Sequence, residues 1–270
     1  MRPKSQSTAT DPAAARSVCP PARLTGMIES VEMPLPQPQP IAIRDLRPTQ
    51  MTVGFREVAE RRRRWRAAAA TVEAAARRLI VPVVLGPCAR SYVLDRHHEL
   101  CALAAEGVAD VQVAVVDDMR RFEWVGFWRT LDRRGWCRPQ DAEGQRQDYS
   151  YIPTTIGGLT DDPFRSLARA VRRAGGYAKE KAPFSDFLWA DFLRQRISRT
   201  LVNDDFELAL RGALTLARNG GPATNRAVQG TKIDLRPKTP GMPTKSSVFD
   251  AVSAAAARER TSADHVGTVT

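Results

Sequence analysis

The sequence is poor in the residues that build most metal and redox centres. Its 270 residues include only three histidines and four cysteines. No two cysteines form a C-x-x-C pair, which excludes the zinc-ribbon and thioredoxin-type motifs. The chain also lacks the G-x-x-x-x-G-K-[ST], G-x-G-x-x-G, H-E-x-x-H and G-x-S-x-G patterns. The common P-loop, dinucleotide-binding, zinc-protease and serine-hydrolase motifs are therefore absent.

Long hydrophobic runs are absent as well. The longest apolar run near an expected strand is LIVPVVL at 79–85, which is too short to span a bilayer. The first residues, MRPKSQSTATDPAAARSVCPP, contain no apolar segment of the kind that a secretory signal needs. We therefore expect a cytoplasmic protein that has no membrane partner.

Positive charge is what the chain has in excess. The net charge is +11 and the sequence pI is about 10.1, whereas 43% hydrophobic residues are enough to build a sizeable core. A basic balance favours anionic partners such as nucleic acid, nucleotides or anionic lipid, without choosing among them. The alternative is a soluble protein whose composition is simply rich in arginine.

Composition divides the chain into four segments. Residues 1–40 are rich in Pro, Ser, Thr, Ala and Gln, which predicts a disordered, Pro-rich arm. Residues 41–120 alternate strand and helix patterns, and 121–219 are mainly helical in pattern. Residues 220–270 resemble the arm and predict a mostly disordered tail. We therefore expect an α/β domain, a helical module packed on it, and two tails.

Hydrophobic periodicity places the elements of the α/β segment. Apolar residues from Phe55 to Leu79 recur at spacings of three, four or seven, which indicates one face of a helix or helix pair, with Glu57 and Arg61 paired on the wet side. A Gly-Pro turn predicts a β-hairpin, in which Pro82 suggests an edge or a bulge. The full prediction is a strand at 41–46, helix 55–79, hairpin strands 80–85 and 91–95, helix 96–106 and strand 111–116.

Capping signals place the later helices. Asp162 and Pro163 stand where a helix N-cap and its first residue are favoured. Asp204 and Glu207 have the spacing of a capping box. The predicted helical segments are 122–136, 161–176, 183–197 and 204–221.

The most distinctive stretch is VLDRHHEL at 93–100. Asp95 is expected to end a strand and cap a helix whose first turn carries His97 and His98. Unpaired N–H groups of a first helical turn suit an anion, and an imidazole there can act as acid, base or ligand. The alternative is structural: Asp95 only caps, and His97 packs on Leu100 and Cys101. A metal site is also conceivable, because His97 and Cys101 are four residues apart, with Asp95, His98 and Glu99 as further candidate ligands.

Arginines form two further patterns. One is the run Arg61–Arg64, whose members point all round a helix. The other is the stripe Arg165, Arg169 and Arg172, at helical spacings of four and three, which would suit a phosphate backbone. In both cases the alternative is an ordinary solvated face.

The order of these blocks resembles the ParB/sulfiredoxin fold superfamily, and more closely the ParB-like proteins classed as putative nucleases. The resemblance is carried by IAIRDLRPTQ, GFREVAERRRRW, IVPVVLGPCARSYVLDRHHEL and GVADVQVAVV, continuing into FWRTLDRRGW, DDPFRSLARAVRRAGGYAK and PFSDFLWADFLRQRI, over about 41–200. It implies a small mixed sheet with helices, followed by a helical module. The functional box maps to Asp95–Glu99, where Arg96 replaces the family's glycine and Glu99 its closing arginine. Arg96 also stands where sulfiredoxins have their reactive cysteine.

Three functions are compatible with this resemblance. The first is a nuclease or phosphodiesterase in which His97 or His98 is the acid/base, Asp95 orients a histidine or binds Mg²⁺ or Mn²⁺ with His98, and Glu57 or Glu60 supplies a second carboxylate. Phosphates would be held by arginines, with Arg62, Arg96, Arg165, Arg169 and Arg172 as candidates. The second is a serine-type kinase that uses ATP or ADP, with Glu57 as base; CTP is a further candidate ligand. The third is a non-catalytic nucleic-acid or nucleotide-binding module.

Overall fold

The computed structural model describes residues 38–68, 72–177, 185–220 and 222. Most of the predicted arm and most of the predicted tail lie outside these residues. Within them, strand β1 covers Gln39–Ala42 and thus takes in two residues that the sequence assigns to the arm. No helix in the described part of the chain is both long and apolar enough to cross a lipid bilayer.

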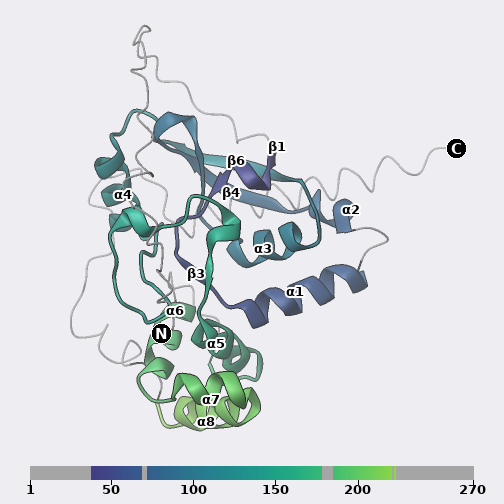
Figure 1. The fold of residues 1–270 in the computed structure, drawn as a ribbon, viewed down its shortest axis with the longest axis vertical. Coiled ribbons are helices and arrows are strands. Elements are labelled where there is room, and N and C mark those ends of the chain that lie inside the picture. Colours follow the sequence, from purple (N-terminus) through teal and green to yellow (C-terminus); the bar gives the residue numbers. More distant parts are fainter. Residues whose placement is uncertain (1–37, 69–71, 178–184, 221, 223–270) are drawn as a thin grey trace, which may run out of the picture.

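A mixed five-stranded sheet forms the centre of the α/β part (Figure 1). Its strand order is β1-β6-β4-β5-β2, with β2 at Leu46–Arg47, β4 at Ile80–Leu85, β5 at Ser91–Val93 and β6 at Asp110–Asp118. The predicted hairpin is confirmed, because β4 and β5 pair antiparallel with Val83 opposite Val93. Pro82 does not mark an edge, since β4 lies between β6 and β5; a register shift against β6 follows Val83.

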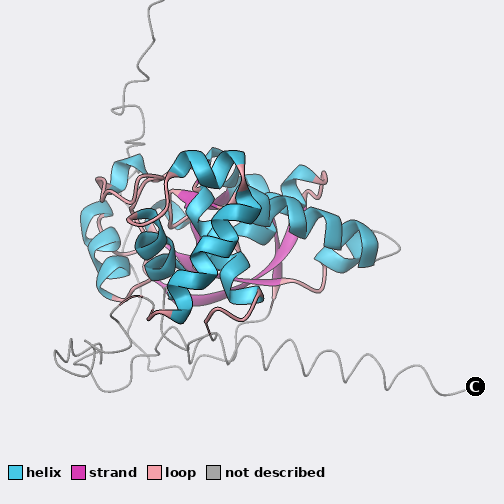
Figure 2. Cartoon of the chain, turned by 90° about the horizontal axis from the view of Figure 1, so that it is seen from below, coloured by secondary structure: helices cyan, strands magenta, loops and turns pink. Residues whose placement is uncertain are grey.

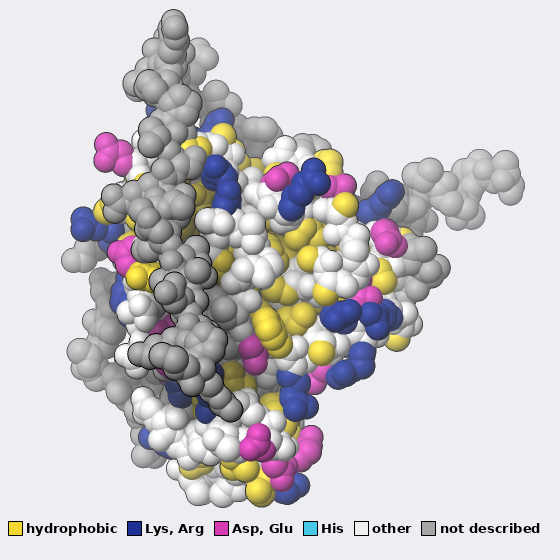
Figure 3. Space-filling model, in the orientation of Figure 1, with side chains coloured by type: hydrophobic (Ala, Val, Ile, Leu, Met, Phe, Trp, Pro, Cys, Tyr) yellow, Lys and Arg dark blue, Asp and Glu magenta, His cyan; other side chains and the backbone are white. Residues whose placement is uncertain are grey.

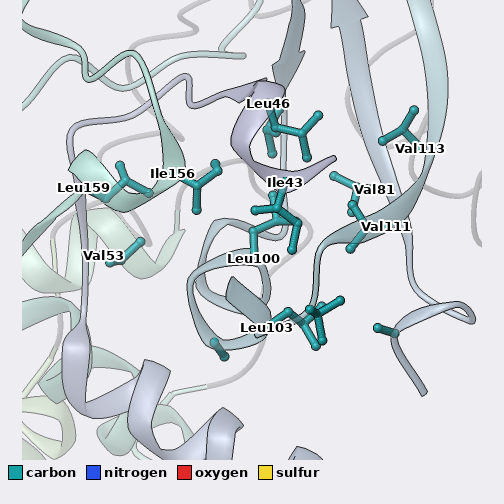
Figure 4. Packing of buried hydrophobic residues seen from close by; sticks show 14 of the residues in the cluster. Ile43, Leu46, Val53, Val81, Leu100, Leu103, Val111, Val113, Ile156 and Leu159 are labelled. Carbon is teal, nitrogen blue, oxygen red and sulfur yellow. The ribbon is translucent and has the colours of Figure 1, made fainter. Parts of the chain in front are cut away.

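Two separate apolar layers cover the sheet. Helices α1 (Phe55–Ala68), α2 (Val72–Ala76) and α3 (His97–Ala105) pack through residues such as Leu100 and Leu103 against Val81 and Val111 (Figure 4). Helix α4 (Trp124–Arg133) contributes Phe127 and other aromatic residues to a second cluster. Phe55, expected in the core stripe, is instead 49% exposed at the first turn of α1.

The helical module follows, as predicted. Helices α5 (Pro163–Arg173), α6 (Ser185–Arg194), α7 (Arg199–Asp204) and α8 (Phe206–Arg218) share one buried cluster (Figures 1 and 2). Asp162 caps α5 by accepting from the Phe164 N–H, and Pro163 is its first residue. The cap of α8 is Asp205 rather than Asp204, which ends α7.

A short parallel pair brings the module against the α/β part. Strand β3 (Thr52–Val53) precedes α1, and β7 (Thr160–Asp161) precedes α5. Because both helices begin next to the same pair, α1 and α5 lie beside each other. Gly54 allows this approach, since a Cβ there would come within 2.3 Å of the Ser166 Oγ. The fold is therefore a mixed α/β sheet with a helical module, as expected from the sequence.

Candidate functional site

The strand–helix junction that carries the two histidines differs from its prediction in one respect. Helix α3 begins at His97 with Arg96, not Asp95, as its N-cap. Arg96 has φ +75°, in the left-handed region, and makes no side-chain cap hydrogen bond. Asp95 is exposed. The junction therefore presents a carboxylate and a guanidinium to solvent.

His97 is buried beneath the segment that precedes β3. Its side chain is 4% exposed, and its Nε2 accepts a hydrogen bond of 3.2 Å from the Thr49 N–H. Thr49 in turn donates its hydroxyl to the Val93 carbonyl at 2.7 Å. An imidazole nitrogen that accepts must be unprotonated. The geometry therefore assigns a neutral His97 that joins the loop before β3 to the end of β5.

His98, the next residue of α3, makes a corresponding contact with the other end of the same segment. Its Nε2 accepts from the Gly54 N–H at 3.1 Å, at the junction between β3 and α1. Burial, followed by the nearby charges of Arg165 and Arg61, holds the pKa of His98 well below its usual value. Both histidines thus accept a backbone N–H through Nε2, and both fix the segment from Thr49 to Gly54.

A buried glutamate surrounded by arginines lies beside this segment. Glu57 is 2% exposed and does not face solvent as expected from its pairing with Arg61. Its carboxylate lies within ion-pair distance of four guanidinium groups. These distances are 2.9 Å to Arg61, 3.5 Å to Arg64, 3.6 Å to Arg169 and 2.6 Å to Arg173.

Two further acidic residues extend this cluster. Glu99 of α3 binds Arg61 and has Arg96 at 4.0 Å, while Glu60 binds Arg173. Burial lowers the pKa of Arg61 to about 10. Three helices, α1, α3 and α5, therefore meet in one charged network. It contains more arginines than acidic groups, and its exposed members are Arg64, Arg96 and Arg173, with side chains 62%, 43% and 40% exposed.

The predicted stripe of Arg165, Arg169 and Arg172 does share one helix face, but the face is turned inward. Arg165 is buried, donates to the Thr52 carbonyl and stacks 3.9 Å over the Phe187 ring. Burial lowers its pKa to about 10. Arg172 pairs with Asp186 of α6 at 2.7 Å, and Arg169 bridges Asp186 and Glu57. The stripe thus joins α5 to its neighbours and is not a solvated face.

The other candidate residues have defined positions as well. Arg62 pairs with Glu106 at the C-terminal end of α3, as does Arg66. Figure 3 shows Lys and Arg side chains gathered over the outer side of α1. Cys101, considered as a metal partner of His97, directs its Sγ to the Ile156 carbonyl at 3.8 Å, and burial raises its pKa to about 12.

The candidate metal ligands do not come together in the part of the chain that the structure describes. Within those residues no group of three or more His, Cys, Asp and Glu side chains could hold a metal ion. The Nε2 of His98, one of the two candidate ligands, is already bonded to Gly54. We therefore derive no metal-dependent step from this geometry.

Comparisons with known proteins agree with the fold. The model of the family described as "Putative ParB-like nuclease" matches residues 39–195. The chain belongs to this putative ParB-like nuclease family. A crystal structure of protein Atu1540 from Agrobacterium tumefaciens is similar, with a TM-score of 0.63 and 48% sequence identity over 67% of this chain and 92% of that chain. A search of proteins with curated functions found no match.

One residue of the box at Asp95–Glu99 has an unusual backbone conformation. Where the ParB-like pattern has glycine, this chain has Arg96 in a left-handed conformation that favours glycine. Three further residues of the site, Thr49, Gly54 and Ser166, lie 40 to 70 positions away from the box, and no local motif indicates them. Arg173 directly follows the predicted arginine stripe.

Proposed function

We propose that this chain binds the phosphate backbone of nucleic acid where α1, α3 and α5 meet, and hydrolyses phosphodiester bonds there. The observation that supports this most is the convergence of four arginines on the buried Glu57. With Arg96 and Arg172 the network contains six guanidinium groups, and its four carboxylates, those of Glu57, Glu60, Glu99 and Asp186, leave a surplus of two positive charges. A surplus of fixed positive charge favours a polyanion.

Arg64 and Arg96 are the residues that would contact phosphate. Their side chains are 62% and 43% exposed and their ion pairs are long, at 3.5 Å to Glu57 and 4.0 Å to Glu99, whereas the exposed Arg173 is held at 2.6 Å by Glu57. The two loose pairs can be exchanged for a phosphate oxygen at little cost. Arg62, Arg165, Arg169 and Arg172 are held in closer contacts and would maintain the shape and charge of the site.

Hydrolysis needs a base for water and a proton for the leaving oxygen. Asp95 is an exposed carboxylate beside the exposed Arg96. It would take a proton from the attacking water, while the P–O bond to the leaving oxygen breaks and that oxygen takes a proton from solvent. If His97 or His98 takes part in proton transfer it must do so through Nδ1, because Nε2 is occupied. Their first role would be to position the loop.

A serine-type kinase is not favoured by any contact in the site. That reaction would use Glu57 as base for a substrate hydroxyl, but Glu57 is enclosed by arginines and 2% exposed. A non-catalytic binding module would use the same arginines as a hydrolase. Only a cleavage assay can therefore distinguish these two functions.

The test combines binding and cleavage on one set of variants. End-labelled single- and double-stranded DNA is incubated with the protein, with and without Mg²⁺ or Mn²⁺. Replacing Arg64 and Arg96 together by Gln should weaken binding and reduce the slope of log affinity against log salt by about 2, whereas Arg211→Gln on α8 should do neither. Asp95→Asn should abolish cleavage and retain binding.

Two outcomes would contradict the proposal. If the double variant binds like the unmodified chain, phosphate is held elsewhere. If the unmodified chain binds through these arginines but never cleaves, with or without the metal ions, the third function, a binding module, replaces the first.

A further inference from the structure

Strand β6 is longer than the strand that covers its outer edge. β1 pairs with β6 from Gln39 opposite Val113 to Ala42 opposite Asp110. β6 continues to Asp118, and no described strand pairs with its outer side beyond Val113 (Figure 1). An uncovered row of backbone groups on an edge favours pairing with another strand.

One hydrogen bond shows which residues of β1 face β6. The Ile43 N–H donates to the Ala109 carbonyl at 2.8 Å, and the register places these two residues opposite each other. In an antiparallel pair such bonded pairs alternate with non-bonded ones. Odd-numbered residues before Ile43 therefore direct their N–H groups to β6. Even-numbered residues, including Pro40, direct their backbone outward, where a missing N–H costs nothing.

The sequence before β1 keeps the same alternation. It reads MPLPQPQP over 33–40, with proline at 34, 36, 38 and 40. All four prolines have the parity that points away from β6, whereas Leu35 and Gln37 keep the N–H groups that can pair with it. If the register of β1 were continued, Gln37 would lie opposite Val115. Val115 is the last residue of β6 before the register between β6 and β4 shifts.

An exposed apolar patch lies just beyond the end of β6. It consists of Phe122, Trp124 and Val125, which are 42%, 40% and 50% exposed. Continuing β1 backwards by five residues covers about 17 Å, the length that β6 needs from Ala114 to Asp118. The apolar residues Ile28, Val31 and Met33 would then arrive at the patch.

We propose that residues 34–38 extend β1 along the outer edge of β6, and that residues 28–33 cover the patch formed by Phe122, Trp124 and Val125. The partner of this surface is thus the chain's own Pro-rich segment. The outward prolines would close the new edge against addition of a further strand.

Hydrogen exchange of the Val115 amide tests the pairing directly in the full chain. We expect its exchange to be slowed about tenfold or more relative to an unprotected amide, because one hydrogen bond closes it. Exchanging the two residues at 36 and 37, as Pro36→Gln with Gln37→Pro, keeps the composition but puts proline in the bonded position. This variant should lose the protection, because a proline ring at position 37 would take the place of the N–H that faces β6 and so prevent the strands from pairing. Gln37→Ala should keep the protection. The indole signal of Trp124, identified by Trp124→Phe, should shift in the first variant only.

Three results would overturn the proposal. One is a Val115 amide that exchanges as fast as an unprotected one in the unmodified chain. Another is protection of the Val115 amide that survives in the variant with Pro36→Gln and Gln37→Pro, since something else would then cover the edge. The third is protection that rises with protein concentration, which would assign the edge to a second copy of the chain.

Discussion

Replacing His97 by Ala removes the buried bond that holds the loop before β3. The variant leaves the Thr49 N–H without its partner in a site where His97 is 4% exposed. The Thr49 hydroxyl bond to the Val93 carbonyl would remain, so the loop would be loosened and not released. The expected consequence is a loss of stability, and any effect on DNA binding or cleavage should follow from it.

The magnitude can be worked from the structure. A buried N–H left unsatisfied costs about 1–3 kcal/mol. The space left by the imidazole adds to this, as it does for other large-to-small core substitutions, which gives about 2–4 kcal/mol in total. For a folded part of this size, each kcal/mol lowers the Tm by about 2–4 °C. His97→Ala should therefore melt roughly 4–16 °C lower, and His97→Gln, whose amide oxygen can still accept, should lose less.

The assay is thermal unfolding together with DNA binding and cleavage at a temperature where every variant is folded. We expect His97→Ala to melt early and its folded fraction to bind DNA normally. The same comparison applies to His98→Ala, which would free the Gly54 N–H. A His97→Ala variant with an unchanged Tm and cleavage reduced by roughly 10²–10⁴-fold would refute the reasoning, because a loss of that size without unfolding is typical of a catalytic acid or base.

Other predictions follow from the same site. Arg96→Gly should raise the stability by about 1 kcal/mol, measured by denaturant unfolding, because glycine adopts φ +75° without strain; it should also weaken DNA binding. Gly54→Ala should cost about 1–3 kcal/mol by the same measurement, and Ser166→Gly should restore only part, because the Ser166 N–H also lies 2.8 Å from the new Cβ. His98 is neutral in the folded chain, so its contribution to stability is complete above the usual histidine pKa of about 6.5 and falls with pH below it, by at most 1.4 kcal/mol per unit. Burial raises the pKa of Asp162 to about 6, so this group contributes a stability that instead grows as the pH falls. The effect of His98 is therefore measured as the difference between the pH profiles of the unmodified chain and His98→Gln. Equal profiles would contradict the prediction.

Elements whose position is determined by residues close together in the sequence were predicted correctly. The β4–β5 hairpin followed from two apolar runs around a Gly-Pro turn, and the start of α5 from Asp162 and Pro163. In each case the deciding interactions span only a few positions, so a local pattern contains them. The prediction at Asp204 was wrong by one residue for the same reason: two adjacent aspartates offer the same local signal, and only the end of α7 decides which one caps α8.

Features of the site that depend on distant contacts could not be predicted. Glu57 and Arg61 have the spacing of an exposed pair, yet Arg173, more than 100 positions later, completes the cluster that buries Glu57. The stripe on α5 was recognised, but which way it faces depends on the pairing of β3 with β7. A periodic pattern gives the faces of a helix and does not say what packs against each of them.

Arg96 connects the conformation of the box with its proposed role. A left-handed arginine stores strain of about 1–3 kcal/mol, which the surrounding contacts must offset. The contacts made by His97 and His98 on the following turn fix α3 against the loop before α1, and so can hold that conformation. In return, the left-handed turn places the Arg96 guanidinium at the exposed end of the box, within 4.0 Å of Glu99 and in the same network as Glu57. If the strain at Arg96 is retained for the sake of its charge, Arg96→Gly and Arg96→Ala should weaken DNA binding equally. Only Arg96→Gly should raise stability, because alanine keeps the Cβ that strains the left-handed conformation.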